Sequence, residues 1–278
     1  WLPLAHVEAP TAISVLLAGI LLKLGIYGIL RINYGLMPDG VYWFSGALAV
    51  LGLINVIWGG LCALAQTDLK KLVAYSSVNH MGYSLIGMAA IVAAGEANGM
   101  NLKAAQAGLG GAVFQMFNHG TISAMLFILV GVIYDRAHHR DIEGFGGLAA
   151  QMPIYTGITA VAFFAGLGLP GFSGFISEAM CFIGAFPVYK GIVIASTIGI
   201  LLNAAYFLWA FQRIFFGELN EKYTDLPEIN RLELFTVVPL LVITIFFGIY
   251  PAPYLDIIAS TIDVIIDHVV TLATFASM

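Results

Sequence analysis

The stretch TAISVLLAGILLKLGIYGIL, residues 11–30, decides the fold class of this chain. It is an apolar run in which Lys23 is the single charged residue. About 20 apolar residues in an α-helix cross the roughly 30 Å hydrocarbon core of a bilayer. A lysine near the middle of such a helix costs roughly 2.5–3.5 kcal/mol on insertion scales, so ionisable groups there usually have a function. Ion or proton movement is the first hypothesis for Lys23, and the alternative is a lysine that snorkels or pairs for packing.

The composition of the chain also indicates a helical membrane protein. Hydrophobic residues make up 60% and charged residues 10% of the sequence, whereas soluble domains carry about 25% charged residues. The mean hydropathy of +0.93 excludes a water-soluble globular core. Long apolar stretches predict helices rather than a barrel. A net charge of −5 provides no basic surface for nucleic acid, and Cys62 and Cys181 have no metal or disulfide spacing.

Seven spanning segments are predicted, so the expected fold class is all-α and polytopic. Their approximate ranges are 11–31, 42–65, 72–94, 107–134, 154–186, 189–216 and 234–250. The fifth is too long for one straight helix and contains GLGLPGFSG at residues 166–174. Proline and glycine interrupt helices, which a membrane tolerates where protein or a water-filled cavity satisfies the freed backbone. We therefore expect a broken helix with halves near 154–167 and 174–186.

The end of the chain differs from the spans. Residues 253–278 carry Asp256, Asp263, Asp267 and His268 among apolar residues. This pattern suits a helix that lies at the interface or packs against a partner better than an eighth span.

Cations in the loops predict the orientation, because cytoplasmic loops are enriched in lysine and arginine. Loops on one side of the predicted membrane contain Lys70, Lys71, Arg136, Arg140, Arg213, Lys222 and Arg231. Loops on the other side contain Arg31, Lys103 and Lys190. We expect the first side to face the cytoplasm, with Trp1 on that side and the C-terminus opposite. The chain opens abruptly in a turn-like WLPLAH without an initiator methionine, so we expect helices upstream of this sequence.

Several other polar residues lie inside predicted spans. Glu178 follows the helix break, an arrangement common in ion-coupled transporters. His119 lies mid-span, and an imidazole can accept a proton at one nitrogen and donate from the other. His80 is a weaker relay candidate. Five hydroxyls could order water in a polar axis, those of Tyr75, Ser76, Ser77, Thr121 and Ser123. The alternative for all of these residues is hydrogen bonding that only holds helices together.

Two further patterns are less informative. His138 and His139, with Arg140 and Asp141, fall in a loop, where a solvated role is favoured over a metal site or a switch. The spacing G-x-G-x-x-G at residues 166–171 follows no strand and lies in a membrane segment, so it fails the structural test for dinucleotide binding. No haem or iron–sulfur pattern occurs. We therefore expect no metal or cofactor site in this chain.

Four longer strings resemble one known family. They are WLPLAHVEAPTAISVLLAGILLKLGIYG (residues 1–28), QTDLKKLVAYSSVNHMGYSL (66–85), FQMFNHGTISAMLFILVGVIYDR (114–136) and LPGFSGFISEAMCFIGAF (169–186). The chain resembles the antiporter-like subunits of respiratory complex I over residues 1 to about 251, and within that family the chain M branch and its mitochondrial counterpart, subunit four. The resemblance implies a subunit of NADH:quinone oxidoreductase that pumps protons and has no redox centre. NADH, FMN, iron–sulfur clusters and quinone would be bound by partner subunits.

The resemblance also implies residue roles. Lys23 would be the central proton carrier, His119 a relay element and Glu178 the terminal carrier toward the outside, and His138 would assist. The family normally has fourteen spans, of which this chain matches the last seven, and it often has an acidic residue at the position of Leu4. Residues 1–252 would thus form an antiporter-like transmembrane domain that is incomplete at its N-terminus, followed by the helix at 253–278.

The resulting prediction is a multi-pass subunit of the bacterial cell membrane that relays protons through Lys23, His119 and Glu178. Its expected partners are the lipid bilayer and other membrane subunits of complex I, including neighbouring antiporter-like subunits, and no nucleic acid. Two alternatives remain open. The chain could belong to the large subunit of a multisubunit sodium/proton antiporter or to a membrane hydrogenase, or it could be a structural scaffold whose internal charges only hold helices together.

Overall fold

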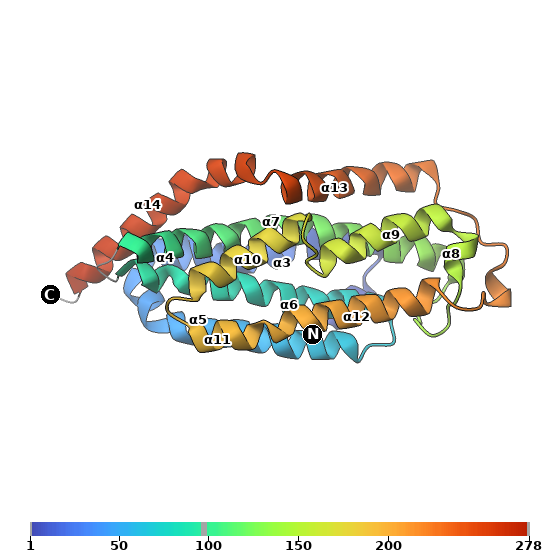
Figure 1. Cartoon of the computed structure of the whole chain (residues 1–278), viewed down its shortest axis with the longest axis horizontal. Helices are drawn as coiled ribbons and strands as arrows, with labels where there is room; N and C mark the ends of the chain where they lie inside the picture. Colours follow the sequence, from blue (N-terminus) through green and yellow to red (C-terminus); the bar gives the residue numbers. More distant parts are fainter. Residues whose placement is uncertain (1, 96–98, 277–278) are drawn as a thin grey trace.

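In the computed structural model, residues 2–95 and 99–276 are described, and they form an elongated bundle of helices (Figure 1). Six helical stretches of the described residues are long and apolar enough to cross a membrane: Thr11–Leu36, Pro38–Leu64, Leu69–Gly95, Asn101–Ala137, Lys190–Phe215 and Arg231–Ile249. Two shorter apolar helices, α9 (Pro153–Gly166) and α10 (Ser173–Ala185), form the broken helix. The all-α, polytopic prediction is confirmed, including the interruption in the fifth span.

The remaining bounds follow the chain order. The first span consists of α2 (Thr11–Leu16), η1 (Leu17–Leu21), α3 (Leu22–Gly28), η2 (Ile29–Asn33) and α4 (Tyr34–Leu36), where η1 and η2 are π-helical turns. Then come α5 (Pro38–Leu64), α6 (Leu69–Ala89), η3 (Ala90–Gly95) and α7 (Gly99–Ala137). The short α8 (Leu148–Gln151) precedes the broken helix, which is followed by α11 (Lys190–Ser196), α12 (Ile198–Phe215), η4 (Glu221–Tyr223), α13 (Arg231–Ile249) and α14 (Ala252–Ala276).

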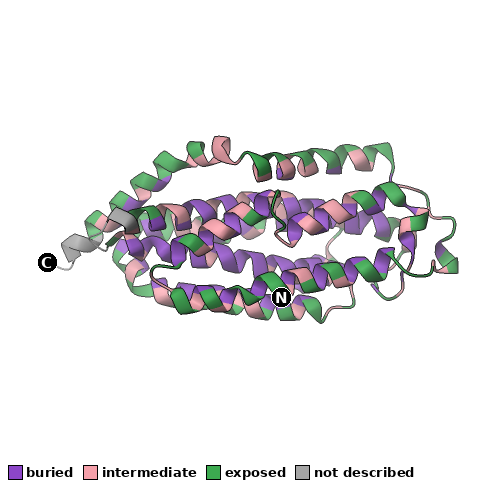
Figure 2. Cartoon of the chain, viewed as in Figure 1, coloured by how far each residue is buried: buried purple, intermediate pink, exposed green. Residues whose placement is uncertain are grey.

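The core of the bundle is built around α6 and α7. Figure 2 shows buried residues along both helices, whereas in α13 the buried residues are Val237 and Thr244. Glycines let the inner helices approach closely, as is common in membrane bundles. A Cβ atom at Gly184 of α10 would lie 2.2 Å from the backbone nitrogen of Gly108 in α7. The second half of the broken helix, α10, is thereby held against α7 at backbone distance.

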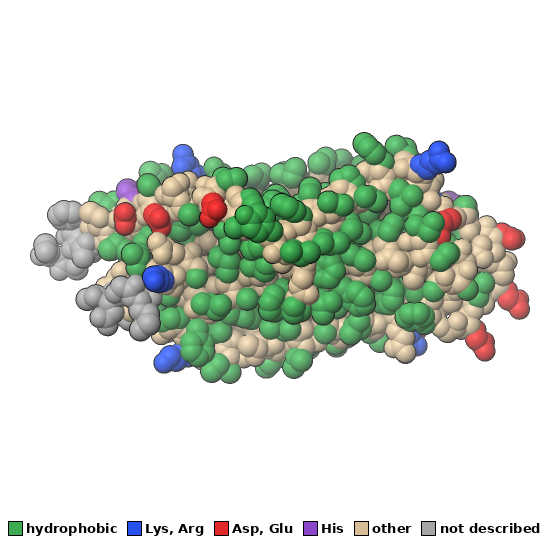
Figure 3. All heavy atoms as spheres, turned by 45° about the horizontal axis from the view of Figure 1, so that its top comes forward, with side chains coloured by type: hydrophobic (Ala, Val, Ile, Leu, Met, Phe, Trp, Pro, Cys, Tyr) green, Lys and Arg blue, Asp and Glu red, His purple; other side chains and the backbone are tan. Residues whose placement is uncertain are grey.

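The outer surface of the bundle is apolar along its length. In Figure 3, hydrophobic side chains cover the middle of the visible face, and charged side chains gather toward its two ends. Trp43 on α5 is 86% exposed and Phe235 on α13 is 76% exposed. Such large exposed apolar residues suit contact with lipid or with partner helices.

The N-terminal segment differs from the sequence-based expectation. Within the WLPLAH segment, which we expected to be turn-like, residues from Leu2 onward form a helix, α1 (Leu2–Glu8). Pro3 stands in its first turn, where the missing N–H breaks no intrahelical bond, and α1 packs against α6. His6 is buried and stacks on Phe127 of α7 with ring centroids 4.6 Å apart. Trp1 lies outside the described residues.

Seven cations of the helix ends and loops lie at one end of the bundle, called here the Arg136 end, where α6 begins and α7 ends. Asp68 caps α6 by accepting from the N–H groups of Lys70 and Lys71, and its other oxygen lies 3.3 Å from Nε of Arg140. The cations at this end are Lys70, Lys71, Arg136, Arg140, Arg213, Lys222 and Arg231. Arg31, Lys103 and Lys190 belong to the opposite end. Which end faces the cytoplasm stays a prediction.

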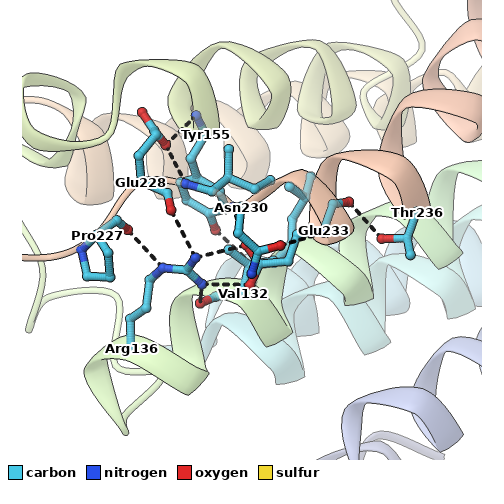
Figure 4. A network of polar contacts seen from close by, with 10 residues as sticks. Val132, Arg136, Tyr155, Pro227, Glu228, Asn230, Glu233 and Thr236 are labelled. Atoms are coloured by element: carbon cyan, nitrogen blue, oxygen red, sulfur yellow. Dashed lines mark hydrogen bonds and ion pairs between the residues drawn. The ribbon is translucent and has the colours of Figure 1, made fainter.

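One polar network at the Arg136 end ties three helices together (Figure 4). The guanidinium of Arg136, in the last turn of α7, donates to both carboxylate oxygens of Glu233 at 2.9 and 2.8 Å. Glu233 also completes a capping box with Asn230 at the start of α13. Glu228 accepts from the N–H groups of Ile154 and Tyr155 at 2.9 and 3.1 Å, so an anion stabilises the N-terminus of α9.

The last helix, α14, lies against the opposite end of the bundle and contacts α7, α5 and α4. Its residues Ile262, Ile266 and Val269 are buried, at a spacing that places them on one helical face. Asp263 is exposed and accepts from the side chain of Gln106 at 2.7 Å. The division into a domain at 1–252 and a separate helix at 253–278 stays a prediction.

Candidate functional site

The break between α9 and α10 brings Glu178 to the interior. Gly168 and Gly171 adopt positive φ angles of 79° and 102°, which non-glycine residues rarely adopt. A Cβ atom at Gly168 would lie 2.9 Å from Oε2 of Glu178. The absence of a side chain at Gly168 therefore lets the carboxylate approach the unwound backbone of the break.

Glu178 is paired with a histidine of α6. Nδ1 of His80 lies 3.0 Å from Oε1 of Glu178, and both side chains are buried, with exposed fractions of 7% and 6%. A carboxylate and an imidazole at this distance share a hydrogen bond in which the proton can reside on either partner. The other ring nitrogen of His80, Nε2, is buried and has no partner among the described protein atoms.

His119 of α7 joins this pair. The rings of His80 and His119 have centroids 5.5 Å apart, and Nδ1 of His119 also lacks a partner among the described protein atoms. Both rings and Glu178 line an internal cavity of about 10 Å³, which suits about one water molecule. Its other lining residues are Ser76, Gln115, Ile122, Ser123, Leu126, Ala165, Gly166 and Gly174.

Lys23 lies on the other side of Ser123. Its ammonium donates to the carbonyl oxygen of Ala18, in the π-helical turn that directly precedes α3, and to Oγ of Ser123 at 3.4 Å. Lys23 is 8% exposed and is in no ion pair among residues 2–95 and 99–276. On its open side it lines a groove of about 500 Å³ between the first span and α7, which also includes Gly120 and Tyr254. Ser123 therefore connects the lysine to the cavity.

The other predicted residues lie in different places. Ser76 lines the cavity, and its hydroxyl donates to the carbonyl of Val73 at 2.7 Å. Tyr75 is half-buried and packs against the apolar core instead. His138 is exposed in the loop after α7 with a φ of 57°, so the structure does not bring it to the cavity.

Of the two adjacent histidines, His139 is the one whose ring packs against other side chains. Its ring stacks on Phe145 with centroids 4.3 Å apart and contacts the hydroxyl of Tyr223. Burial lowers the pKa of His139, and the charge of Asp141 opposes that effect. This cluster links the loop after α7 to the loop before α13 at the Arg136 end.

Sequence reasoning did not single out three polar residues next to the site. Gln115, Asn118 and Ser177 form hydrogen bonds between α7 and α10. The signal was present in the spacing, because residues 115, 118 and 119 fall on one face of a helix. No cluster of three or more histidine, cysteine, aspartate or glutamate side chains that could hold a metal occurs within the described part of the chain.

Comparisons with known proteins identify the family of this chain. The family model described as "NADH:quinone oxidoreductase/Mrp antiporter, TM" matches residues 1–203. The NADH-quinone oxidoreductase subunit M of Rhodobacter capsulatus is 42% identical over 263 residues, which are 94% of this chain and 49% of that protein. The NADH-ubiquinone oxidoreductase chain 4 of Marchantia polymorpha is 38% identical over 269 residues, 96% of this chain and 52% of that protein. The chain thus spans about half the length of these relatives.

Solved structures share the fold. A chain of respiratory complex I from Thermus thermophilus superposes with a TM-score of 0.86 at 25% identity, covering 97% of this chain and 54% of that one. A chain of the Mrp complex from Dietzia has a TM-score of 0.81 at 21% identity, covering 97% of this chain and 57% of that one, which is a likeness of fold alone. The resemblance found in the sequence strings is confirmed. Because the family model matches well over half of its residues, this chain belongs to the NADH:quinone oxidoreductase/Mrp antiporter transmembrane family.

Proposed function

We propose that this chain is part of a chain M-type subunit of NADH:quinone oxidoreductase and that it translocates protons through Lys23, His119 and Glu178. One observation carries the proposal. Three titratable side chains from three helices, His80, His119 and Glu178, surround one buried cavity, and Ser123 connects that cavity to Lys23. Buried ionisable groups in a membrane bundle are costly, and a connected set of them is typical of proton relays.

The proposed steps are proton transfers between neighbouring groups. Lys23 releases a proton through Ser123 or a water to His119, whose imidazole accepts at one nitrogen and donates from the other. His119 passes the proton across the cavity to His80, which exchanges it with Oε1 of Glu178, the terminal carrier toward the positive-outside face. Burial and neighbouring charges set how readily each group holds the proton. Charge changes in adjacent subunits would drive the sequence electrostatically.

The proposed setting is a multi-pass subunit in the bacterial cell membrane, surrounded by lipid and by other membrane subunits of complex I, including antiporter-like neighbours. The identity to the Rhodobacter capsulatus subunit supports this setting. NADH, FMN, iron–sulfur clusters and quinone would act in partner subunits, so this chain would contribute no redox active site.

The decisive test is Lys23→Ala in the full-length subunit, assembled in its complex and reconstituted into vesicles. We expect NADH-driven proton translocation per electron to fall while the complex still assembles. Lys190→Ala is the matched control, because Lys190 is exposed at the start of α11 and should leave translocation unchanged. Normal translocation per electron in Lys23→Ala would refute the route.

Two other functions predict different outcomes. A scaffold should tolerate Glu178→Gln with unchanged translocation, whereas a relay should lose it. The family model also covers the Mrp antiporters, so a sodium/proton antiporter subunit is the second candidate. That function predicts sodium-dependent proton exchange in vesicles without NADH oxidation. A relay that is driven by complex I predicts no such exchange.

A further inference from the structure

Three buried polar side chains connect α7 to α10 directly beside His119 and Glu178 of the proposed relay. Oγ of Ser177 donates to Oε1 of Gln115. The amide nitrogen of Asn118 donates to Oγ of Ser177 at 3.1 Å and to the carbonyl oxygen of Ser173 at 2.9 Å. The exposed fractions of Gln115, Asn118 and Ser177 are 1%, 0% and 0%. We call these three residues the α7–α10 clamp.

The position of the clamp along α10 allows it to control the direction in which the Glu178 side chain points. The helix has 13 residues and begins directly after the unwound break. Its first turn has no preceding helical turn to fix its rotation, because the break separates it from α9. Glu178 follows Ser177 and points about 100° further around the helix axis. When Ser177 faces α7, Glu178 is therefore directed toward His80 and the cavity, as observed.

The other half of α10 is held in a different way. A Cβ atom at Gly111 would lie 2.7 Å from the backbone nitrogen of Cys181, and Gly108 and Gly184 touch backbone to backbone. Steric contact thus fixes α10 toward its C-terminus, and hydrogen bonds fix it toward the break. Small residues and interhelical hydrogen bonds are the usual means of packing helices in a membrane. The hydrogen-bonded half is the half that carries Glu178.

We propose that Asn118, with Gln115 and Ser177, positions the Glu178 carboxylate for proton exchange with His80. This inference rests on the proposed function, because it assigns a positioning role for that same relay. Asn118 acts through α10, since its amide donates to Ser173 and Ser177 and forms no hydrogen bond with His80 in the described part of the chain. Asn118 contacts the N-terminal part of α10 through the carbonyl oxygen of Ser173 and the hydroxyl of Ser177.

The test is Asn118→Ala in the full-length subunit within the assembled complex, measured as protons translocated per electron. Asn79→Ala is the matched control. Asn79 is equally buried, lies next to His80 and donates an amide to the carbonyl of Val56 at 2.6 Å, but it bonds to α5 instead of α10. We expect Asn118→Ala to lower translocation and Asn79→Ala to leave it unchanged.

The Asn79 control separates positioning from packing. Equal losses in Asn118→Ala and Asn79→Ala would overturn the inference. Normal translocation in Asn118→Ala with an impaired Glu178→Gln would also overturn it and leave the proposed function standing. Normal translocation in Glu178→Gln would refute both.

A second pair of variants covers the case in which Asn118→Ala does not assemble. Ser177→Thr keeps the hydroxyl that links Gln115 to Asn118, and Ser177→Ala removes it. We expect translocation to survive in the threonine variant and to fall in the alanine variant. Equal translocation in the two variants would refute the clamp.

Discussion

Gly168→Ala is the substitution that most directly tests the position of the Glu178 carboxylate. The added Cβ atom would lie 2.9 Å from Oε2, so the carboxylate must retreat by about 0.5 Å to reach an ordinary contact of 3.4 Å. A retreat of that size can stretch the 3.0 Å contact with His80 to the outer limit of a hydrogen bond. The backbone angle of 79° adds a strain of roughly 1–2 kcal/mol for a residue with a Cβ atom.

Gly171→Ala separates these two effects. Gly171 has a φ of 102° in the same break, and a Cβ atom there would meet nothing within 4 Å. Both variants should lower the thermal stability of the purified complex by a similar amount, since both place alanine at a positive φ. Only Gly168→Ala should reduce protons translocated per electron. Normal translocation in Gly168→Ala, or equal losses in the two variants, would refute the reasoning.

Two further predictions concern packing and pH. Gly184→Ala should cost about 1–3 kcal/mol or prevent assembly, because its Cβ atom would collide with the backbone of α7. Gly191→Ala, with open space around its Cβ position, should assemble normally in the same solubilisation assay. Burial lowers the pKa of His139 below its unfolded value of 6.5, so its neutral form stabilises the fold. That contribution is complete above pH 6.5 and is lost as the pH falls toward the lower folded pKa. Limited proteolysis of the loop after α7 should therefore accelerate below pH 6.5, and His139→Gln should remove the pH dependence whereas His138→Gln should retain it.

The helices of this chain were predictable from composition, because apolar length alone decides what can cross a bilayer. The break at residues 166–174 was predictable from its proline and glycines. The helix at Leu2–Glu8 was not, since its formation depends on packing against α6. The π-helical turn before Lys23 was not either, because its residues, LAGIL, carry no marker of a widened turn.

Contacts between helices were the part that the sequence left open. His80 was a weaker relay candidate than His119, and the structure pairs His80 directly with Glu178. The pairing depends on the rotation of α6 and α10 about their axes, which apolar periodicity defines poorly when a helix is buried on most sides. Conversely, the family resemblance implied a role for His138, and the backbone directs it outward while His139 packs inward.

Two structural features, one on each side, constrain the position of the Glu178 carboxylate on the short helix α10. Gly168 provides the space on the side of the break, and the α7–α10 clamp sets the rotation of α10 through Ser177. If both act on the one distance between His80 and Glu178, their effects cannot be independent, because sites that share a partner couple energetically. The double variant Gly168→Ala with Asn118→Ala should therefore translocate no fewer protons per electron than the more impaired single variant. Losses that multiply would instead show that the break and the clamp act on different steps.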